Sequence, residues 1–298
     1  MPQLLKNGKL STMLLKTKLH LPKQAIKLVK RPEIVKHFSL KRRLTMLTAP
    51  AGYGKTNMVL EWLESLSVLV GWVSLDEGDN DVNQFTQYLL AACENAATEF
   101  VKLRSQVRDA TSSLSIEYVL VALINIFVDL SQPYILVLDD YHLIQNPDIH
   151  DAITFLIKNK PANLHIVMIS RSELPFPIGG WRAKNEVTEL RAAELRLSQA
   201  EIVAFFAAQN LSDLSKEDIQ ALAERTEGWV AALQLAAIAM KGKESVSDFI
   251  LDFTGSHIYV VDYLTDEVMQ QQPELTQRFL MQTSLLPRLS ANLCDVTL

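Results

Sequence analysis

Residues 49–56 read Ala-Pro-Ala-Gly-Tyr-Gly-Lys-Thr, a set of side chains that could hold the phosphate groups of a nucleotide. Gly52 and Gly54 would let successive backbone N–H groups turn toward phosphate oxygens, and the helix expected next would add its positive dipole end. Lys55 would place an ammonium on the β- and γ-phosphates, and the Thr56 hydroxyl would bind Mg²⁺. The segment therefore predicts a phosphate-binding loop for ATP or ADP with Mg²⁺.

One position of this loop departs from the usual pattern, because Ala49 stands where the first glycine is common. That position forms the outer turn, whereas the tight Gly-x-Gly-Lys-Thr part is complete. At usual residue frequencies this part arises by chance in only roughly a few per thousand chains of this length. The residues expected at the nucleotide phosphates are Pro50, Ala51, Gly52, Tyr53, Gly54, Lys55, Thr56 and Asn57.

A second chemical signal is the run Leu-Val-Leu-Asp-Asp at residues 136–140. Aliphatic residues that end in an acid are typical of a central strand that delivers a carboxylate to its C-terminal edge, where doubly wound sheets bind ligands. Asp139 would hold Mg²⁺ directly or through water, and Asp140 would orient or deprotonate the attacking water. Such a run is a weak signal alone, because strand-end loops favour Asp. Its place downstream of a phosphate-binding loop favours the metal role.

Three further side chains are candidates for contacts with the nucleotide. Arg171 follows the next predicted strand and could reach the γ-phosphate and report its presence; the alternative is a solvated arginine at a strand end. Gly228 ends one predicted helix and Trp229 opens the next, so the pair could form a lid over the nucleotide. A plain core role is the alternative for Trp229.

Two other polar segments carry no site prediction. The acid-rich segment 76–81 lacks the spacing of a calcium loop, so we expect a solvated turn. His142 has no partner at the spacing of a zinc site. The sequence also shows no nucleophilic triad.

The elements that must position these residues alternate between strands and helices. Short buried strands are expected at 44–48, 68–75, 134–138 and 164–170, and helices at 31–40, 56–66, 82–98, 115–130 and 148–158. This alternation predicts an α/β fold, a P-loop NTPase domain with a central, mostly parallel sheet covered on both faces.

The strands stop near residue 190, and helices follow at 198–209, 215–225, 229–240, 245–253, 256–271 and 273–283. Ser198 and Glu201 form a capping box at the first of these helices. We therefore expect a basic arm at 1–30, the nucleotide-binding domain at 31–195, a helical lid domain at 196–254 and a further domain at 255–298.

Charge is distributed unevenly along the 298 residues. Residues 1–43 hold twelve lysines and arginines and one acid, whereas the remainder holds 17 bases and 33 acids. The arm either packs on the acidic body or contacts phosphate or a partner, and the body itself is a poor DNA-binding surface. Two cysteines, Cys93 and Cys294, without pairing or metal spacing fit a reducing interior. With no signal peptide or bilayer-spanning segment, we expect a cytoplasmic protein with no membrane partner.

With these residues in hand, the chain resembles the N-terminal part of the large ATP-binding LuxR-family (MalT-type) regulators, which are signal-transduction ATPases with numerous domains (STAND) and relatives of NB-ARC switches. The resemblance runs from Leu15 to the end of the chain. Its motifs, in order, are 16–19 (Lys-Thr-Lys-Leu), 51–56 (Ala-Gly-Tyr-Gly-Lys-Thr), 72–80 (Trp-Val-Ser-Leu-Asp-Glu-Gly-Asp-Asn), 139–142 (Asp-Asp-Tyr-His), 170–171 (Ser-Arg), 227–229 (Glu-Gly-Trp) and 263–268 (Tyr-Leu-Thr-Asp-Glu-Val).

The resemblance implies an ATP/ADP switch. The ADP form would be closed and monomeric, whereas ATP with an inducer would open it and allow self-association. Inducer and DNA would bind through superhelical repeats and a C-terminal helix-turn-helix that this chain lacks, so the chain is expected to be an N-terminal fragment. The resemblance also implies that Val29 and Arg31 lie near the adenine, and that residues 255–298 begin a winged-helix domain.

Two other hypotheses remain open at this point. The chain could be a stand-alone P-loop ATPase of the motor or transport type, whose turnover is the product. It could also be a scaffold that keeps ADP as a structural cofactor. Slow Mg²⁺-dependent hydrolysis would favour the switch over the first of these, because typical enzymes turn over at about 1–10³ per second.

Overall fold

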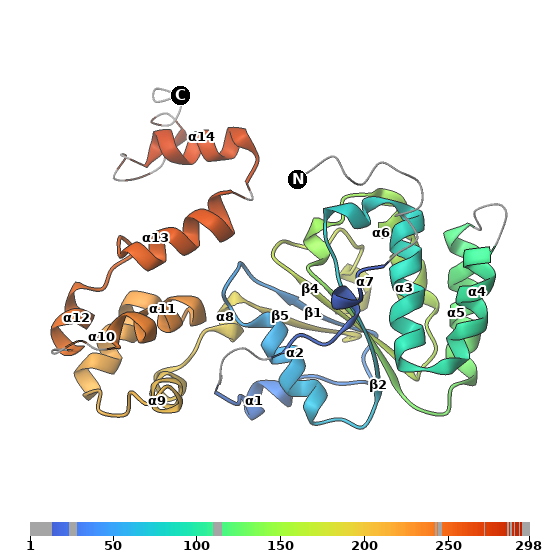
Figure 1. Cartoon of the computed structure of the whole chain (residues 1–298), viewed down its shortest axis with the longest axis horizontal. Coiled ribbons are helices and arrows are strands. Elements are labelled where there is room, and N and C mark those ends of the chain that lie inside the picture. Colours follow the sequence, from blue (N-terminus) through green and yellow to red (C-terminus); the bar gives the residue numbers. More distant parts are fainter. Residues whose placement is uncertain are drawn as a thin grey trace. The chain divides into compact units, whose positions relative to one another are not determined.

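The computed structural model of the chain describes residues 14–23, 29–109, 115–241, 243, 246–270, 272–284, 286, 288, 290, 291 and 293. The chain divides into two compact units, Met1–Leu195 and Arg196–Leu298 (Figure 1). Most of the predicted basic arm, together with Cys294, lies outside the described residues. The division that the sequence places near Gly255 stays a prediction.

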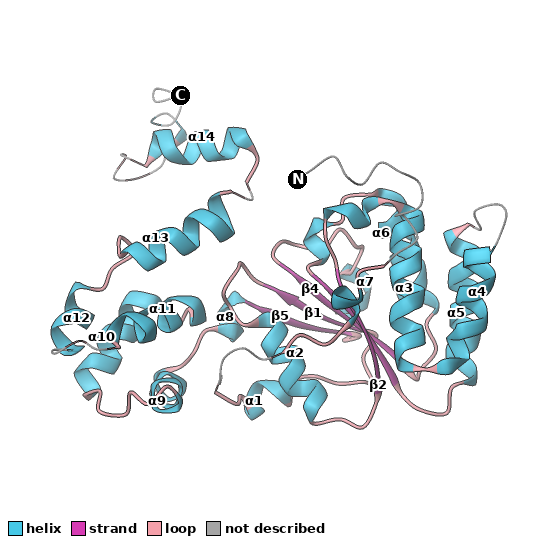
Figure 2. Ribbon diagram, viewed as in Figure 1, coloured by secondary structure: helices cyan, strands magenta, loops and turns pink. Residues whose placement is uncertain are grey.

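The first unit is built on a five-stranded sheet in the order β2-β3-β4-β1-β5, and every neighbouring pair is parallel (Figure 2). The strands are β1 Leu44–Thr48, β2 Leu69–Ser74, β3 Tyr134–Asp139, β4 Leu164–Ser170 and β5 Val187–Arg191. β3 and β4 are buried along their whole length, as expected for strands covered on both faces. The four predicted strands and the α/β fold class are confirmed.

The fifth strand was not predicted. β5 reads Val-Thr-Glu-Leu-Arg and pairs with β1 along one edge of the sheet. Thr188, Glu189 and Arg191 interrupt the continuous apolar run that marks the four predicted strands.

Helices cover both faces of the sheet. The helices of the first unit are α1 Pro32–Val35, α2 Lys55–Glu64, α3 Val82–Ala96, α4 Val101–Asp109, α5 Ile116–Asp129, α6 Pro147–Asn159, α7 Gly179–Ala183 and α8 Ala192–Leu195. Short 3₁₀ turns are η1 Lys16–Leu19, η2 Glu77–Asn80, η3 Thr98–Phe100 and η4 Tyr141–Leu143. Apolar side chains of α3, α5 and α6 form one core cluster with alternate strand residues. Those of α2 and the segment after α1 form a second cluster with the other strand residues.

One helical prediction of the first unit needs correction, and the helix α4 was missed. The helix expected at 31–40 is only the four residues Pro32–Val35, followed by turns. Helix α4 was not predicted, because it is polar and contributes few buried residues.

The described residues of the second unit form helices joined by turns and loops, without strands. Its helices are α9 Gln199–Ala208, α10 Lys216–Thr226, α11 Val230–Met240, α12 Val246–Asp252, α13 Ile258–Leu264 and α14 Glu274–Thr283. The predicted capping box of Ser198 and Glu201 is confirmed at α9. The single helix expected at 256–271 is α13 followed by the π-helical turn Thr265–Met269. Within the described part of the chain, no helix is long and apolar enough to cross a membrane.

Candidate functional site

The predicted phosphate-binding loop connects β1 to α2. Gly52 and Gly54 have φ values of 78° and 74°, in the left-handed region that favours glycine. Gly54 is also the N-cap of α2 and, because it has no side chain, it forms no side-chain cap hydrogen bond with that helix. The N–H groups at the start of α2 are therefore not satisfied by a side-chain cap, which is the arrangement that favours an anion there.

Lys55 folds back over the loop that precedes it. Its side-chain ammonium donates hydrogen bonds to the carbonyls of Ala49 at 2.6 Å and Pro50 at 2.9 Å. The residue is only 8% exposed. Burial, followed by the Arg171 charge, lowers the pKa of Lys55 to about 8, against the opposing effect of the two acids at the end of β3. The ammonium is thus charged at neutral pH and lies within the loop.

The Thr56 hydroxyl lies beside Asp139. This hydroxyl donates a hydrogen bond to the carboxylate of Asp139 at 3.2 Å, although β4 separates β1 from β3 in the sheet. Asp139 is 5% exposed, and burial together with the Asp140 charge raises its pKa to about 7. Hydrogen bonds from Thr56 and from the Asp140 N–H oppose that rise.

A hydroxyl and a carboxylate in contact are ligands that suit Mg²⁺. Among the described residues no group of three or more His, Cys, Asp or Glu side chains could hold a metal ion by itself. Mg²⁺ commonly binds one or two protein oxygens and completes its shell with substrate phosphates and water. The Thr56–Asp139 pair fits that pattern.

Asp140 begins the turn that follows β3. Its φ of 56° is left-handed, which is uncommon for a residue with a side chain. Its N–H donates to the Asp139 carboxylate at 3.0 Å, and its own carboxylate lies 3.8 Å from Nδ1 of His142. Strained backbone of this kind occurs often at functional sites.

His142 belongs to the same cluster, although the sequence predicted no role for it. Its Nδ1 is buried and has no hydrogen-bond partner among the described residues. Burial lowers the pKa of His142, as do the charges of Arg171 and Lys55, whereas Asp140 raises it. The available signal was its position, two residues after Asp140.

Arg171 follows β4 directly and is half-buried. Its charge acts on both Lys55 and His142, so it belongs to the same electrostatic environment. The loop is also bonded to this strand, since the Ala49 N–H donates to the Ser170 carbonyl at 3.3 Å. The carboxyl ends of β1, β3 and β4 thus bring together the predicted catalytic and metal-binding side chains.

The predicted turn at 76–81 is present and mostly exposed, but Asp79 is not solvated. Asp79 is fully buried, and the segment forms the 3₁₀ turn η2 with its own capping box. Lys18, from the described part of the basic arm, is also buried and forms ion pairs with Asp76 and Asp79. At this point the arm packs on the acidic body, as the first of the two interpretations expected.

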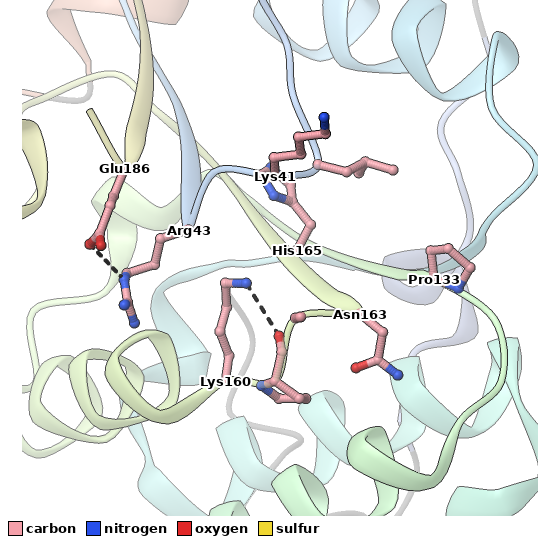
Figure 3. A pocket seen from close by; sticks show the side chains of 10 residues that line it. Lys41, Arg43, Pro133, Lys160, Asn163, His165 and Glu186 are labelled. Carbon is pink, nitrogen blue, oxygen red and sulfur yellow. Dashed lines mark hydrogen bonds and ion pairs between the residues drawn. The ribbon is translucent and has the colours of Figure 1, made fainter. Parts of the chain in front are cut away.

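A separate cavity of about 620 Å³ lies at the opposite, amino edge of the sheet (Figure 3). Arg43 and Glu186 form an ion pair there at 3.1 Å, and the Lys160 ammonium donates to main-chain carbonyls of Pro161 and Leu164. These charged groups already have partners within the chain. The cavity also contains none of the predicted site residues.

Comparison with known proteins places this arrangement in a family. The family model described as the MalT winged helix domain matches residues 265–298. The HTH-type transcriptional regulators MalT of Klebsiella pneumoniae (strain 342) and Serratia proteamaculans (strain 568) are each 34% identical to the chain over 248 residues, which is 82% of its length. The chain is a relative of the MalT-type regulators. It spans 27% of the length of each of these MalT proteins.

Solved structures agree with the MalT-type relationship at the level of fold. A STAND protein with a tetratricopeptide repeat sensor from Pyrococcus horikoshii has a TM-score of 0.55 at 15% identity, covering 92% of this chain and 37% of its own. A Walker-type ATPase of Pyrococcus abyssi has a TM-score of 0.54 at 13% identity, covering 87% of this chain and 79% of its own. The P-loop fold class is thereby confirmed, and the winged-helix match covers residues 265–298.

The residues that the MalT-type resemblance assigns to the adenine lie before α1. Arg31 is 7% exposed, and its guanidinium donates to the carbonyls of Leu195 at 2.8 Å and Glu194 at 3.3 Å. Its N–H donates to the Glu61 carboxylate at 2.6 Å. Val29 is half-buried. The adenine contact of both residues stays a prediction.

Gly228 and Trp229 belong to the second unit. Gly228 has a φ of 71°, and a Cβ atom there would lie 2.4 Å from the Leu197 carbonyl oxygen. Packing against Leu197 is therefore enough to explain why residue 228 is a glycine. The Trp229 ring is half-buried and contacts the Tyr263 ring at 5.6 Å between centroids. Their predicted lid role stays a prediction as well.

Proposed function

We propose that this chain is the ATP/ADP-binding switch module of a MalT-type transcriptional regulator and that it hydrolyses ATP slowly with Mg²⁺. The observation that carries the proposal is the junction of β1 and α2. There a buried lysine, an uncapped helix start and a Thr56–Asp139 pair come together at one sheet edge. A triphosphate with its counter-ion matches this combination of one ammonium, backbone N–H groups and paired oxygens.

Each side chain of the site has a distinct role in this proposal. Lys55 leaves its two carbonyl partners and binds the β- and γ-phosphates. Thr56 and Asp139 hold Mg²⁺, which would neutralise charge on the phosphate oxygens. Asp140 orients or deprotonates the attacking water, and Arg171 binds the γ-phosphate and so distinguishes ATP from ADP.

The remaining nucleotide contacts follow from the same assignment. Residues 50–57 surround the phosphates with main-chain N–H groups. Val29 and Arg31 contact the adenine, and Gly228 and Trp229 contribute from the second unit. These contacts are the part of the proposal that depends most on the MalT-type relationship.

Regulation would act through self-association. The ADP form is closed and monomeric, and ATP with an inducer opens it, so that copies associate. DNA is bound by a helix-turn-helix domain outside this chain, and the inducer by a sensor domain that is also outside it. The relatives are described as HTH-type regulators, and the chain spans 27% of their length, which supports this division of labour. Such a regulator works in the cytoplasm.

The rate of turnover tests the switch against a stand-alone motor or transport ATPase. We expect the purified chain to bind Mg-ATP and to hydrolyse it well below about one molecule per second, the lower end of typical enzyme rates. A fast steady-state rate would contradict the switch and favour an enzyme. If ADP removed from the protein could not be replaced by ATP without unfolding, a scaffold that keeps ADP would be the better description.

A further inference from the structure

The loop that follows the acid pair is bonded to Asn80, a residue from the turn η2 after β2. The side-chain Nδ2 of Asn80 donates a hydrogen bond to the Leu143 carbonyl at 2.8 Å. Its Oδ1 accepts the backbone N–H groups of Gln145 at 2.6 Å and Asn146 at 3.1 Å. Asn146 returns a bond from its own amide to the Asn80 carbonyl at 2.8 Å. One side chain therefore fixes the path of the chain between β3 and α6.

Leu143 connects Asn80 to Asp140 through hydrogen bonds of its backbone. Its N–H donates to the Asp140 carbonyl at 3.1 Å and so closes the turn η4, which also contains His142. Asp140 is in the left-handed region, and a residue with a side chain stays there only when its surroundings fix it. The bonds from Asn80 to the far end of this turn supply such a restraint.

The residue that precedes Asn80 in the same turn, Asp79, belongs to a buried ion pair. Asp79 is fully buried and accepts hydrogen bonds from the Asp76 N–H at 2.9 Å and the Gln84 amide at 3.2 Å. The ammonium of Lys18 pairs with Asp79 and lies 4.2 Å from the centre of the Tyr88 ring. Without Lys18 the charge of Asp79 would be buried and unpaired, which is costly enough to rearrange the turn η2.

We propose that Asn80 and the Lys18–Asp79 ion pair are positioning residues for ATP hydrolysis. They act through the turn 140–143 and aim the Asp140 carboxylate at the attacking water. This inference rests on the proposed function, because Asp140 needs a bound triphosphate to act on. It gives a role to residues 76–80 and to the described part of the basic arm, neither of which touches the phosphate-binding loop in any contact described above.

The Asn80→Ala variant tests the proposal by separating hydrolysis from binding. We expect its affinity for Mg-ATP, measured by isothermal titration, to stay within about twofold of the wild type. Its single-turnover hydrolysis should slow by about tenfold or more, since a small displacement of a catalytic group costs that much. Glu77→Gln, an exposed change on the same turn, is the matched control and should alter neither quantity.

The Lys18→Met variant is the second test and decides the matter if Asn80→Ala does not fold. It should show the same separation of binding from hydrolysis, whereas Lys16→Met, which changes an exposed lysine of the same 3₁₀ turn, should behave as wild type. Wild-type hydrolysis rates in both Asn80→Ala and Lys18→Met would overturn the inference, as would a parallel loss of binding and hydrolysis. A wild-type chain that binds no Mg-ATP would instead contradict the proposed function.

Discussion

The buried ammonium of Lys55 determines how the phosphate-binding loop responds to its ligand. Its two hydrogen bonds go to carbonyls of the same loop, so the charge has no fixed acid partner at hydrogen-bond distance in what the structure describes. A phosphate bound in this loop would therefore interact electrostatically with an ammonium that is already desolvated.

Lys55→Ala should weaken Mg-ATP binding by at least about tenfold, because a hydrogen bond to a charged group contributes about 1.5–3 kcal/mol. Isothermal titration measures the effect. Lys36→Ala, which removes an exposed lysine, is the control and should bind as the wild type does. Unchanged affinity in Lys55→Ala would contradict the assignment of the loop.

Asp139 predicts a pH dependence of Mg²⁺-dependent binding. Its folded-state pKa of about 7 lies above the ordinary value of 3.8, so below pH 7 the carboxyl holds a proton that Mg²⁺ must displace. We expect Mg-ATP affinity to fall by up to about tenfold per pH unit below 7. The Asp139→Asn variant should lose most of this dependence and should impair hydrolysis more than binding. Titrations from pH 5.5 to 8 would reveal an equal slope in both proteins if Asp139 does not hold the metal.

The sequence predicted the loop, Asp139 and Asp140 because the residues that indicate their chemistry are contiguous in the chain. It assigned no role to His142 or Asn80, because the roles of these residues depend on neighbours that lie far away in the sequence. Asn80 bonds to residues more than sixty positions away, and the burial of Asp79 depends on Lys18 from the arm. Short motifs carry no information about such pairings.

At the scale of elements, β1 and β4 are joined by side chains as well as by their ladder. His165 on β4 is buried and hydrogen-bonds the Thr45 hydroxyl at 2.9 Å and the Arg42 carbonyl at 3.0 Å. Burial is the main reason that the pKa of His165 is lowered to about 4. The folded protein therefore keeps this imidazole neutral in mild acid.

This lowered pKa predicts a loss of stability in acid. The unfolded chain takes up a proton on this residue below pH 6.5, whereas the folded chain does so only near pH 4. The free energy of unfolding should thus fall by up to about 1.4 kcal/mol per pH unit between these values. His165→Gln should reduce the slope in urea unfolding between pH 7.5 and 4.5. His37→Gln, an exposed change, should keep it; an equal slope in all three proteins would contradict the prediction.

Inner strands were predictable because burial on both faces makes them continuous apolar runs, as in β3 and β4. The strand β5 lacks that signal because polar residues interrupt its sequence, and the helix α4 lacks it because most of its residues are polar. Helix α1 is shorter than expected, and Pro32 at its first turn marks only where the helix begins.

At the scale of the whole molecule, nucleotide-dependent association is the prediction that separates a switch from a static binding domain. We expect analytical ultracentrifugation to show a larger mass with Mg²⁺ and a non-hydrolysable ATP analogue than with ADP. The Lys55→Ala variant should keep the same mass with both nucleotides. Equal masses of the wild-type chain with the two nucleotides would mean that this part of the regulator does not drive self-association.

Arg31 also has a mechanical consequence. Its guanidinium binds the last two carbonyls of the first unit, and its backbone belongs to the segment proposed for the adenine. A force applied to the chain after Leu195 would therefore act on those two hydrogen bonds before it acted on the sheet. In the proposed function, force applied at Leu195 would therefore reach the segment that binds the adenine.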